Sequence, residues 1–164
     1  QDLQGEYRED QERGVGIMIH QCSNGRRIIV SNMDELISAI TDQVTPCVAL
    51  FPAWRHEQVE VSYWEGVVRF LLDRGCTYFV CAGVYSEELH DAVDDFLYQY
   101  DDELGVEKSI GVVTTYHADE SIEDVVNFFV HSTVIWDKAK GCMVAILDAS
   151  DSEEMKVIRC LAAS

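Results

Sequence analysis

Residues 111–129 read GVVTTYHADESIEDVVNFF and contain the parts of one strand–loop–helix unit. The apolar run at the start lacks the alternation expected of a sheet with one wet face, which predicts a strand covered on both faces. Ser121 followed by Asp124 forms a capping box at the start of a helix. The segment TTYHADES, residues 114–121, is therefore expected to be the loop that leads from a strand into a helix.

The same alternation of strand and helix recurs along the chain. Apolar runs of strand length are SIGVVTT at 109–115, CVALF at 47–51, TYFVCAG at 77–83 and CMVAILD at 142–148. Further capping boxes pair Ser62 with Glu65 and Ser150 with Glu153. Strands joined by right-handed helical crossovers predict a three-layer α/β/α sandwich with a mostly parallel, flavodoxin-like or Rossmann-like sheet.

Upstream of this alternation the sequence predicts a β-hairpin. GIMIH and RRIIV are short β-branched runs separated by Asn24-Gly25, a strong hairpin turn signal. Asn32 is the expected N-cap of a short helix that follows. The start of the chain is polar and lacks periodicity, so we expect a flexible tail over residues 1–14 and a single α/β domain over residues 15–164.

The charge balance narrows the classes of partner. The chain has 12 basic and 30 acidic residues, a formal net charge of -18, which repels nucleic acid and anionic membrane surfaces. A basic protein or a metal cation would be attracted, although many acidic proteins are merely soluble. Six cysteines without a C-x-x-C pair predict buried reduced thiols. With no apolar run near the length of a membrane span, we expect a cytoplasmic protein.

Ligands of an open parallel sheet lie beyond the carboxyl ends of its strands, where the strand order reverses. With a flavodoxin-like order, 2-1-3-4, the ends of the first and third strands face each other. Those ends are FPAWRH, residues 51–56, and TTYHADE, residues 114–120. We therefore expect a ligand crevice lined by Trp54, Arg55, Thr114, Thr115 and Tyr116, with Asp148 reaching it from the end of the last strand.

Candidate catalytic residues lie in the same two segments. His117, Asp119 and Glu120, with His56 across the crevice, could form an acid–base set, and His117 with Asp119 could bind a divalent metal. The alternative is that the two acids are ordinary first-turn residues of a helix and that His117 is a loop histidine. The loop after the first strand, PAWRHEQVEVS, has no glycine to cradle a phosphate. Apart from a divalent metal, no cofactor is expected.

The densest group of acids falls on an expected helix over residues 87–103. Its apolar stripe, which includes Leu89 and Val93, should face the sheet. The acids share the outer side: Glu87, Asp91, Asp94, Asp95 and Asp102. No lysine relieves their repulsion, whereas a plain solvated face would usually mix signs. This side is therefore expected to bind a basic protein, with solubility alone as the alternative.

GVVTTYHADESIEDVVNFF and the earlier YWEGVVRFLLDRGCTYFVCAG resemble an uncharacterised bacterial family of Rossmann-like domains. In that family a similar threonine–aromatic–histidine–acid segment leads into a helix, and Tyr116 stands where the family has a tryptophan. The likeness covers about the last two-thirds of the chain and rests on a short motif. It implies the fold and a bacterial cytosolic setting, and it carries no established activity.

Two functions are expected from these patterns. The first is a soluble acidic domain, rather than an enzyme, that recognises a basic protein as an inhibitory or immunity-type protein or as a module of an assembly. The second is a small enzyme or ligand sensor that uses the His/Asp/Glu crevice, with or without a divalent metal.

Overall fold

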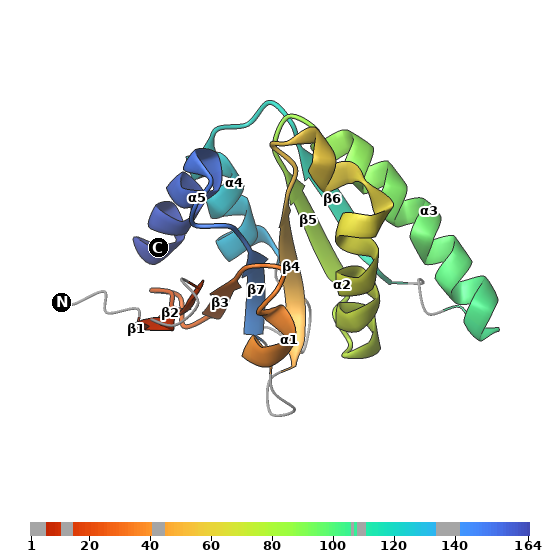
Figure 1. Ribbon diagram of the computed structural model, residues 1–164, viewed down its shortest axis with the longest axis horizontal. Coiled ribbons are helices and arrows are strands. Elements are labelled where there is room, and N and C mark those ends of the chain that lie inside the picture. Colours follow the sequence, from red (N-terminus) through yellow and green to blue (C-terminus); the bar gives the residue numbers. More distant parts are fainter. Residues whose placement is uncertain (1–5, 11–14, 41–44, 106, 108–110, 134–141) are drawn as a thin grey trace.

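The computed structural model shown in Figure 1 describes residues 6–10, 15–40, 45–105, 107, 111–133 and 142–164. Within these ranges the chain forms one seven-stranded sheet in the order β1-β2-β3-β7-β4-β5-β6. The strands are β1 (Glu6–Asp10), β2 (Val15–Gln21), β3 (Arg27–Ser31), β4 (Pro46–Pro52), β5 (Tyr78–Ala82), β6 (Val113–His117) and β7 (Cys142–Ile146). β2 pairs antiparallel with both β1 and β3, and β2 with β3 forms the predicted hairpin. The neighbours from β3 onward in this order, β3, β7, β4, β5 and β6, are parallel. The predicted α/β class, mostly parallel sheet and N-terminal hairpin are confirmed.

Five α-helices are found in the described ranges: α1 (Leu36–Ala39), α2 (Val61–Asp73), α3 (Ser86–Leu104), α4 (Ile122–Asn127) and α5 (Ser152–Ala162). A 3₁₀ turn, η1 (His56–Val59), precedes α2, and a π-helical turn, η2 (Phe128–Ser132), follows α4. None of these helices is both long enough and apolar enough to cross a membrane.

The helix starts agree with the sequence in part. Ser121 accepts the predicted capping bond from the Asp124 N–H at 3.1 Å. α5 is capped instead by Asp151, and the Ser150 hydroxyl donates a hydrogen bond to the Asp148 carboxylate. Asn32 accepts a hydrogen bond from the Glu35 N–H at 2.8 Å, but it caps the turn before α1 rather than α1 itself. α2 begins without a side-chain cap, and Ser62 lies inside its first turn.

The two faces of the sheet carry separate apolar clusters, as the alternation of side chains along a strand requires. In β4, Val48 and Leu50 belong to the cluster that includes α4 and α5. Ala49 and Phe51 belong to the cluster that includes α1, α2 and α3. Figure 1 shows the two groups of helices on opposite sides of the strands. Every residue of β4 and β7 is buried, as their continuous apolar runs predict.

The two edge strands, β1 and β6, differ most from the strands predicted from the sequence. Glu6–Asp10 lies within the predicted tail, yet it pairs with β2 as an edge strand. Its polar sequence, EYRED, lacks the apolar pattern that predicts a strand. An edge strand can form without that pattern, because its hydrogen bonds are made by main-chain groups. At the other edge, β6 runs to His117, so the strand contains the first four residues of TTYHADES, of which Thr114 and Thr115 also belong to the predicted strand run SIGVVTT.

The strand order differs from the flavodoxin-like expectation. The four strands predicted as a series lie in the order β7-β4-β5-β6, so β5 separates β4 from β6. The first and third of these strands are not neighbours, and β4 pairs with β7 instead. The helix after β4 packs on one face and the helix after β7 on the other. The winding therefore changes direction between β4 and β7, which is where an open parallel sheet is expected to bind a ligand.

The cysteines are buried, as predicted, with the exception of Cys160. Cys22, Cys47, Cys81 and Cys142 are buried and free, and Cys160 is free and half-buried. Burial raises the pKa of each of these thiols, for Cys142 to about 11. They therefore stay protonated at neutral pH.

Candidate functional site

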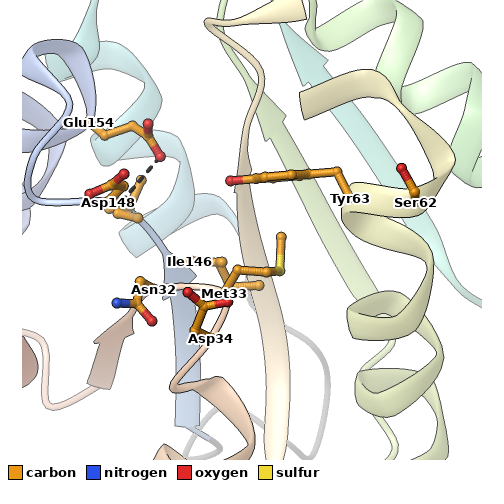
Figure 2. Close-up of a pocket in the computed structure, with 9 residues that line it drawn as sticks. Asn32, Met33, Asp34, Ser62, Tyr63, Ile146, Asp148 and Glu154 are labelled. Carbon is orange, nitrogen blue, oxygen red and sulfur yellow. Dashed lines mark hydrogen bonds between the residues drawn. The ribbon is translucent and has the colours of Figure 1, made fainter. Parts of the chain in front are cut away.

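A cavity of about 440 Å³ lies at the carboxyl ends of β3 and β7, beside the first turn of α2 (Figure 2). It is lined by Asn32, Met33 and Asp34 after β3, Ser62 and Tyr63 of α2, Ile146, Leu147 and Asp148 at the end of β7, and Glu154 of α5. β7 lies between β3 and β4, so the cavity sits beside the change in winding direction. This position and volume are typical of small-molecule sites in open parallel sheets.

Glu154 contributes a buried carboxyl group to this cavity. The residue is 1% exposed. Asp151, the N-cap of α5, accepts hydrogen bonds from the Glu153 and Glu154 N–H groups, which places Glu154 in the first helical turn. From there the Glu154 side chain turns back and accepts a hydrogen bond from the Asp148 N–H at 3.2 Å. Burial raises the pKa of Glu154 to about 7, although the Asp148 N–H and the Arg55 guanidinium favour its ionised form.

Asp148 lines the same cavity, and its pKa is shifted in the opposite direction from that of Glu154. Its Oδ1 accepts hydrogen bonds from the Ser150 hydroxyl at 2.7 Å and from the Ser150 N–H at 2.9 Å. These bonds lower the pKa of Asp148. Near pH 7 one carboxyl is therefore ionised while Glu154 can both hold and release a proton. Two carboxyls with pKa values moved apart by their surroundings are the usual arrangement for acid–base chemistry.

Gln58 and Arg55 support the Glu154 carboxylate from the loop and turn after β4. Gln58 is 1% exposed and uses both ends of its amide. Its Oε1 accepts a hydrogen bond from the Arg55 N–H at 2.9 Å, and its Nε2 donates to Glu154 Oε2 at 3.4 Å. The Arg55 guanidinium lies 3.6 Å from Glu154 Oε2 and 3.6 Å from Asp151 Oδ2. The Glu154 side chain is thus fixed in one orientation.

Main-chain contacts at Gly83 hold this loop against the end of β5. The Ala53 N–H donates to the Ala82 carbonyl at 2.7 Å, and the Tyr85 N–H donates to the Ala53 carbonyl at 2.8 Å. Gly83 has φ +124°, and a Cβ there would lie 2.5 Å from the Ala53 carbonyl carbon. Only glycine fits such a close approach. The position of Arg55, two residues after Ala53, therefore depends on this glycine.

Tyr63 supplies a phenol to the cavity. Figure 2 shows its hydroxyl pointing towards the side on which Asp148 and Glu154 lie. Burial raises the pKa of Tyr63, and the nearby Glu154 carboxyl acts in the same direction. The phenol therefore stays protonated at neutral pH and can donate a hydrogen bond to a ligand.

The residues predicted for the crevice do not all lie together in the structure. Arg55 and Asp148 belong to the cluster around Glu154. Trp54 is half-buried and packs against the apolar cluster on the α4 and α5 side. His56 starts η1, and its ring packs edge-on against Tyr85 at a centroid distance of 5.3 Å.

The remaining crevice candidates lie on or just after the edge strand β6. His117 is buried, its Nδ1 pairs with the Glu120 carboxylate, and its Nε2 lies 3.1 Å from Thr115 Oγ1. Both ring nitrogens thus have partners close in sequence. Tyr116 is exposed and packs against His90, and β5 separates this strand from β4, which precedes His56.

The metal candidates do not gather further ligands in the structure. Asp119 is exposed. In the part of the chain that the structure describes, no three His, Cys, Asp or Glu side chains are grouped so as to hold a metal ion.

The predicted partner-binding acids share one side of α3. Glu87, Asp91, Asp95 and Asp102 are exposed, and Asp94 is partly exposed. His90 lies among them, with ring nitrogens 2.9 Å from Asp91 and 3.6 Å from Asp94. The opposite stripe is buried, as its spacing predicts: Leu89, Val93, Phe96 and Leu97.

Glu154, Tyr63 and Gln58 are site residues that the sequence patterns did not predict. A usable signal was present in DASDSEE, residues 148–154, where acids crowd the end of a buried strand. Those acids were assigned to a capping box of Ser150 with Glu153, so the inward-facing Glu154 was overlooked. Gln58 and Tyr63 had no comparable signal, because nothing in their spacing shows which way they face.

Comparison with curated proteins and with solved structures gave no match. A family model described as a domain of unknown function, DUF7684, matches residues 32–164. This range contains the strands β4 to β7, the helices α1 to α5 and every residue that lines the cavity. By this match over most of its length, the chain belongs to the DUF7684 family.

Proposed function

We propose that the cavity at the carboxyl ends of β3 and β7 binds a small polar ligand and that Glu154 exchanges a proton with it. The protein would act as a small enzyme with Glu154 as its acid–base group, or as a ligand sensor with a proton-dependent contact. One observation carries the proposal: a buried carboxyl, Glu154, and a carboxyl that accepts two hydrogen bonds, Asp148, line the same cavity. These surroundings move the two pKa values in opposite directions, up to about 7 for Glu154 and down for Asp148.

The lining indicates the class of ligand. Asp34, Asp148 and Glu154 offer carboxylate oxygens, and the Tyr63 hydroxyl can donate or accept. Such a wall repels anions, so a neutral or cationic ligand with hydrogen-bond donors fits better than a phosphate ester. In this proposal Asp148 and Tyr63 orient the ligand, Gln58 and Arg55 are positioning residues for Glu154, and no cofactor is required.

A thermal-shift screen of small amines, amides and polyols at pH 6 and pH 8 tests this proposal. A true ligand raises the Tm by mass action, and the size of the shift should differ between the two pH values because Glu154 titrates between them. Glu154→Gln should remove that difference. Glu153→Gln is the matched control, since Glu153 pairs with Lys156 on the surface and does not line the cavity. The same difference in Tm shift between pH 6 and pH 8 in the wild type and both variants would contradict the proposal.

A second candidate is recognition of a basic protein through the outer side of α3, as an inhibitory or immunity-type protein or an assembly module. The observation that favours it is the exposure of like charges on one side of the helix, where the Asp91 side chain is 71% exposed. Exposed acids of this kind steer a cationic surface into contact. Charge reversal on this side, described in the Discussion, tests it.

We also propose a three-layer, Rossmann-like arrangement and a cytoplasmic setting in a bacterium. The two helix groups packed on opposite faces support the first, and the resemblance noted above supports both. The buried, protonated thiols support a reducing compartment. An experimental structure with helices on one face only would contradict the arrangement, and a loss of stability in reductant would contradict the compartment.

A further inference from the structure

A second, smaller cavity of about 220 Å³ lies between α2 and α3. It is lined by Val61, Trp64, Glu65, Ala92, Asp95, Phe96 and Gln99. Trp64 and Phe96 are 1% and 4% exposed and pack edge-to-face with ring centroids 5.7 Å apart. Glu65 and Asp95 supply the charge, and both are more exposed than the two rings. The cavity therefore has an aromatic floor and a rim with two carboxylates.

The chain fills the neighbouring part of the same interface with a cation of its own. Arg69 lies one turn after Glu65 on α2. Its guanidinium carbon is 5.3 Å from the ring centroid of Phe96 and 5.4 Å from that of Tyr100. Its Nη2 donates to the Glu103 carboxylate at 3.0 Å. Phe96 thus contacts this cation and also lines the cavity, and an aromatic ring beside a carboxylate is the environment that a guanidinium prefers.

The surroundings of the cavity favour a cation from outside the chain. None of its lining residues is basic. The exposed Asp91 lies one turn before Asp95 on the same helix and adds to the negative potential. Val61, which is 54% exposed at the cavity, offers an apolar contact to the methylene stem of a long basic side chain.

We infer that this cavity is the docking site for an arginine side chain presented by a basic protein partner. The guanidinium would contact the aromatic floor and pair with Glu65 and Asp95, as Arg69 contacts Phe96 and pairs with Glu103 one turn away. This inference rests on the proposed recognition of a basic protein through α3, and it adds the anchor point of that recognition.

Heteronuclear NMR on the full chain, with short acetylated and amidated peptides Gly-Arg-Gly, Gly-Lys-Gly and Gly-citrulline-Gly as probes, tests the inference. The arginine peptide should shift the signals of Trp64, Glu65 and Asp95 in a saturable way, whereas the neutral citrulline peptide should not. Glu65→Gln and Asp95→Asn should each weaken binding about threefold, the effect of one exposed ion pair. Glu88→Gln removes the same charge from an exposed position of the same helix outside the cavity, and it should leave binding nearly unchanged.

Several outcomes would overturn the inference. Equal shifts with the citrulline peptide, or equal weakening by Glu88→Gln, would mean that no specific cation site exists. Shifts of the same residues that depend on protein concentration, without peptide, would assign the cavity to a second copy of the chain. If charge reversal on the outer side of α3 stops capture of a defined basic protein while Glu65→Gln with Asp95→Asn does not, the protein-binding function stands and the anchor site fails. If neither change matters, both fail.

Discussion

The Glu154 carboxylate accepts a hydrogen bond from the Asp148 N–H at 3.2 Å, so the two acids of the larger cavity are joined by the main chain of one short loop. Ser150, between them in sequence, donates two hydrogen bonds to the Asp148 carboxylate. The hydrogen bonds of the loop before α5 therefore favour the ionised form of Asp148, whereas burial favours the protonated form of Glu154. This opposition of the two groups is the physical basis of the proposed proton exchange.

Glu154 should make the stability of the protein fall as the pH rises. Its pKa of about 7 in the folded chain lies above the ordinary value of 4.5, so the folded state keeps a proton that the unfolded chain loses first. The contribution of this group is complete below pH 4.5 and is lost as the pH rises through 7, by about 3 kcal/mol in total. Urea unfolding between pH 4.5 and pH 8 should show this fall in the wild type relative to Glu154→Gln. A difference that stays constant with pH would contradict it.

Gln58→Leu should lower the free energy of unfolding by about 1–3 kcal/mol, because it leaves the buried Glu154 oxygen and the Arg55 N–H without a hydrogen-bond partner. Gln99→Leu, an exposed position on α3, is the control and should change the free energy by no more than about 0.5 kcal/mol. Chemical denaturation measures both. Equal effects would show that Gln58 carries no special role at Glu154.

Much of the fold could be predicted from the sequence, because burial on both faces of a strand leaves a continuous apolar run and burial of one side of a helix leaves an apolar stripe. β4, β5, β7 and the buried stripe of α3 agree with those patterns. The strand order could not be predicted, since no local sequence pattern indicates which of β5, β6 and β7 pair with β4. The crevice was expected between the ends of β4 and β6, whereas the cavity lies at the ends of β3 and β7. Arg55 and Asp148 were found because they follow strands, whereas Glu154 was hidden among capping acids.

Two glycines should respond to alanine in opposite directions. Gly83→Ala should destabilise the protein by more than about 2 kcal/mol, because φ is +124° and the new Cβ would meet the Ala53 main chain. Gly66→Ala, in α2 with no atom close to its Cβ position, should stabilise it by about 0.5–1 kcal/mol. Thermal and urea unfolding of the two variants provide the comparison. A tolerated Gly83→Ala would mean that the loop carrying Arg55 is not held as described.

Charge reversal at Asp91, Asp94 and Asp95 should leave the fold intact, because these residues lie opposite the buried stripe of α3. Relief of like-charge repulsion should stabilise the helix by a few tenths of a kcal/mol. Association with a defined basic protein should become slower, with the largest loss at low salt, where screening is weakest. Stopped-flow association kinetics at two ionic strengths measure this. Unchanged rates would show that the acidic side serves solubility alone.

The central claim is that Glu154 titrates near neutral pH beside an ionised Asp148. Carbon-detected NMR of the side-chain carboxyls, followed from pH 3 to pH 9, reads both groups in the intact protein. We expect Glu154 to titrate with a pKa of about 7, and Asp148 to titrate below its ordinary value of 3.8. A Glu154 carboxyl that titrates near 4.5, the ordinary value, would contradict the proposed acid–base role.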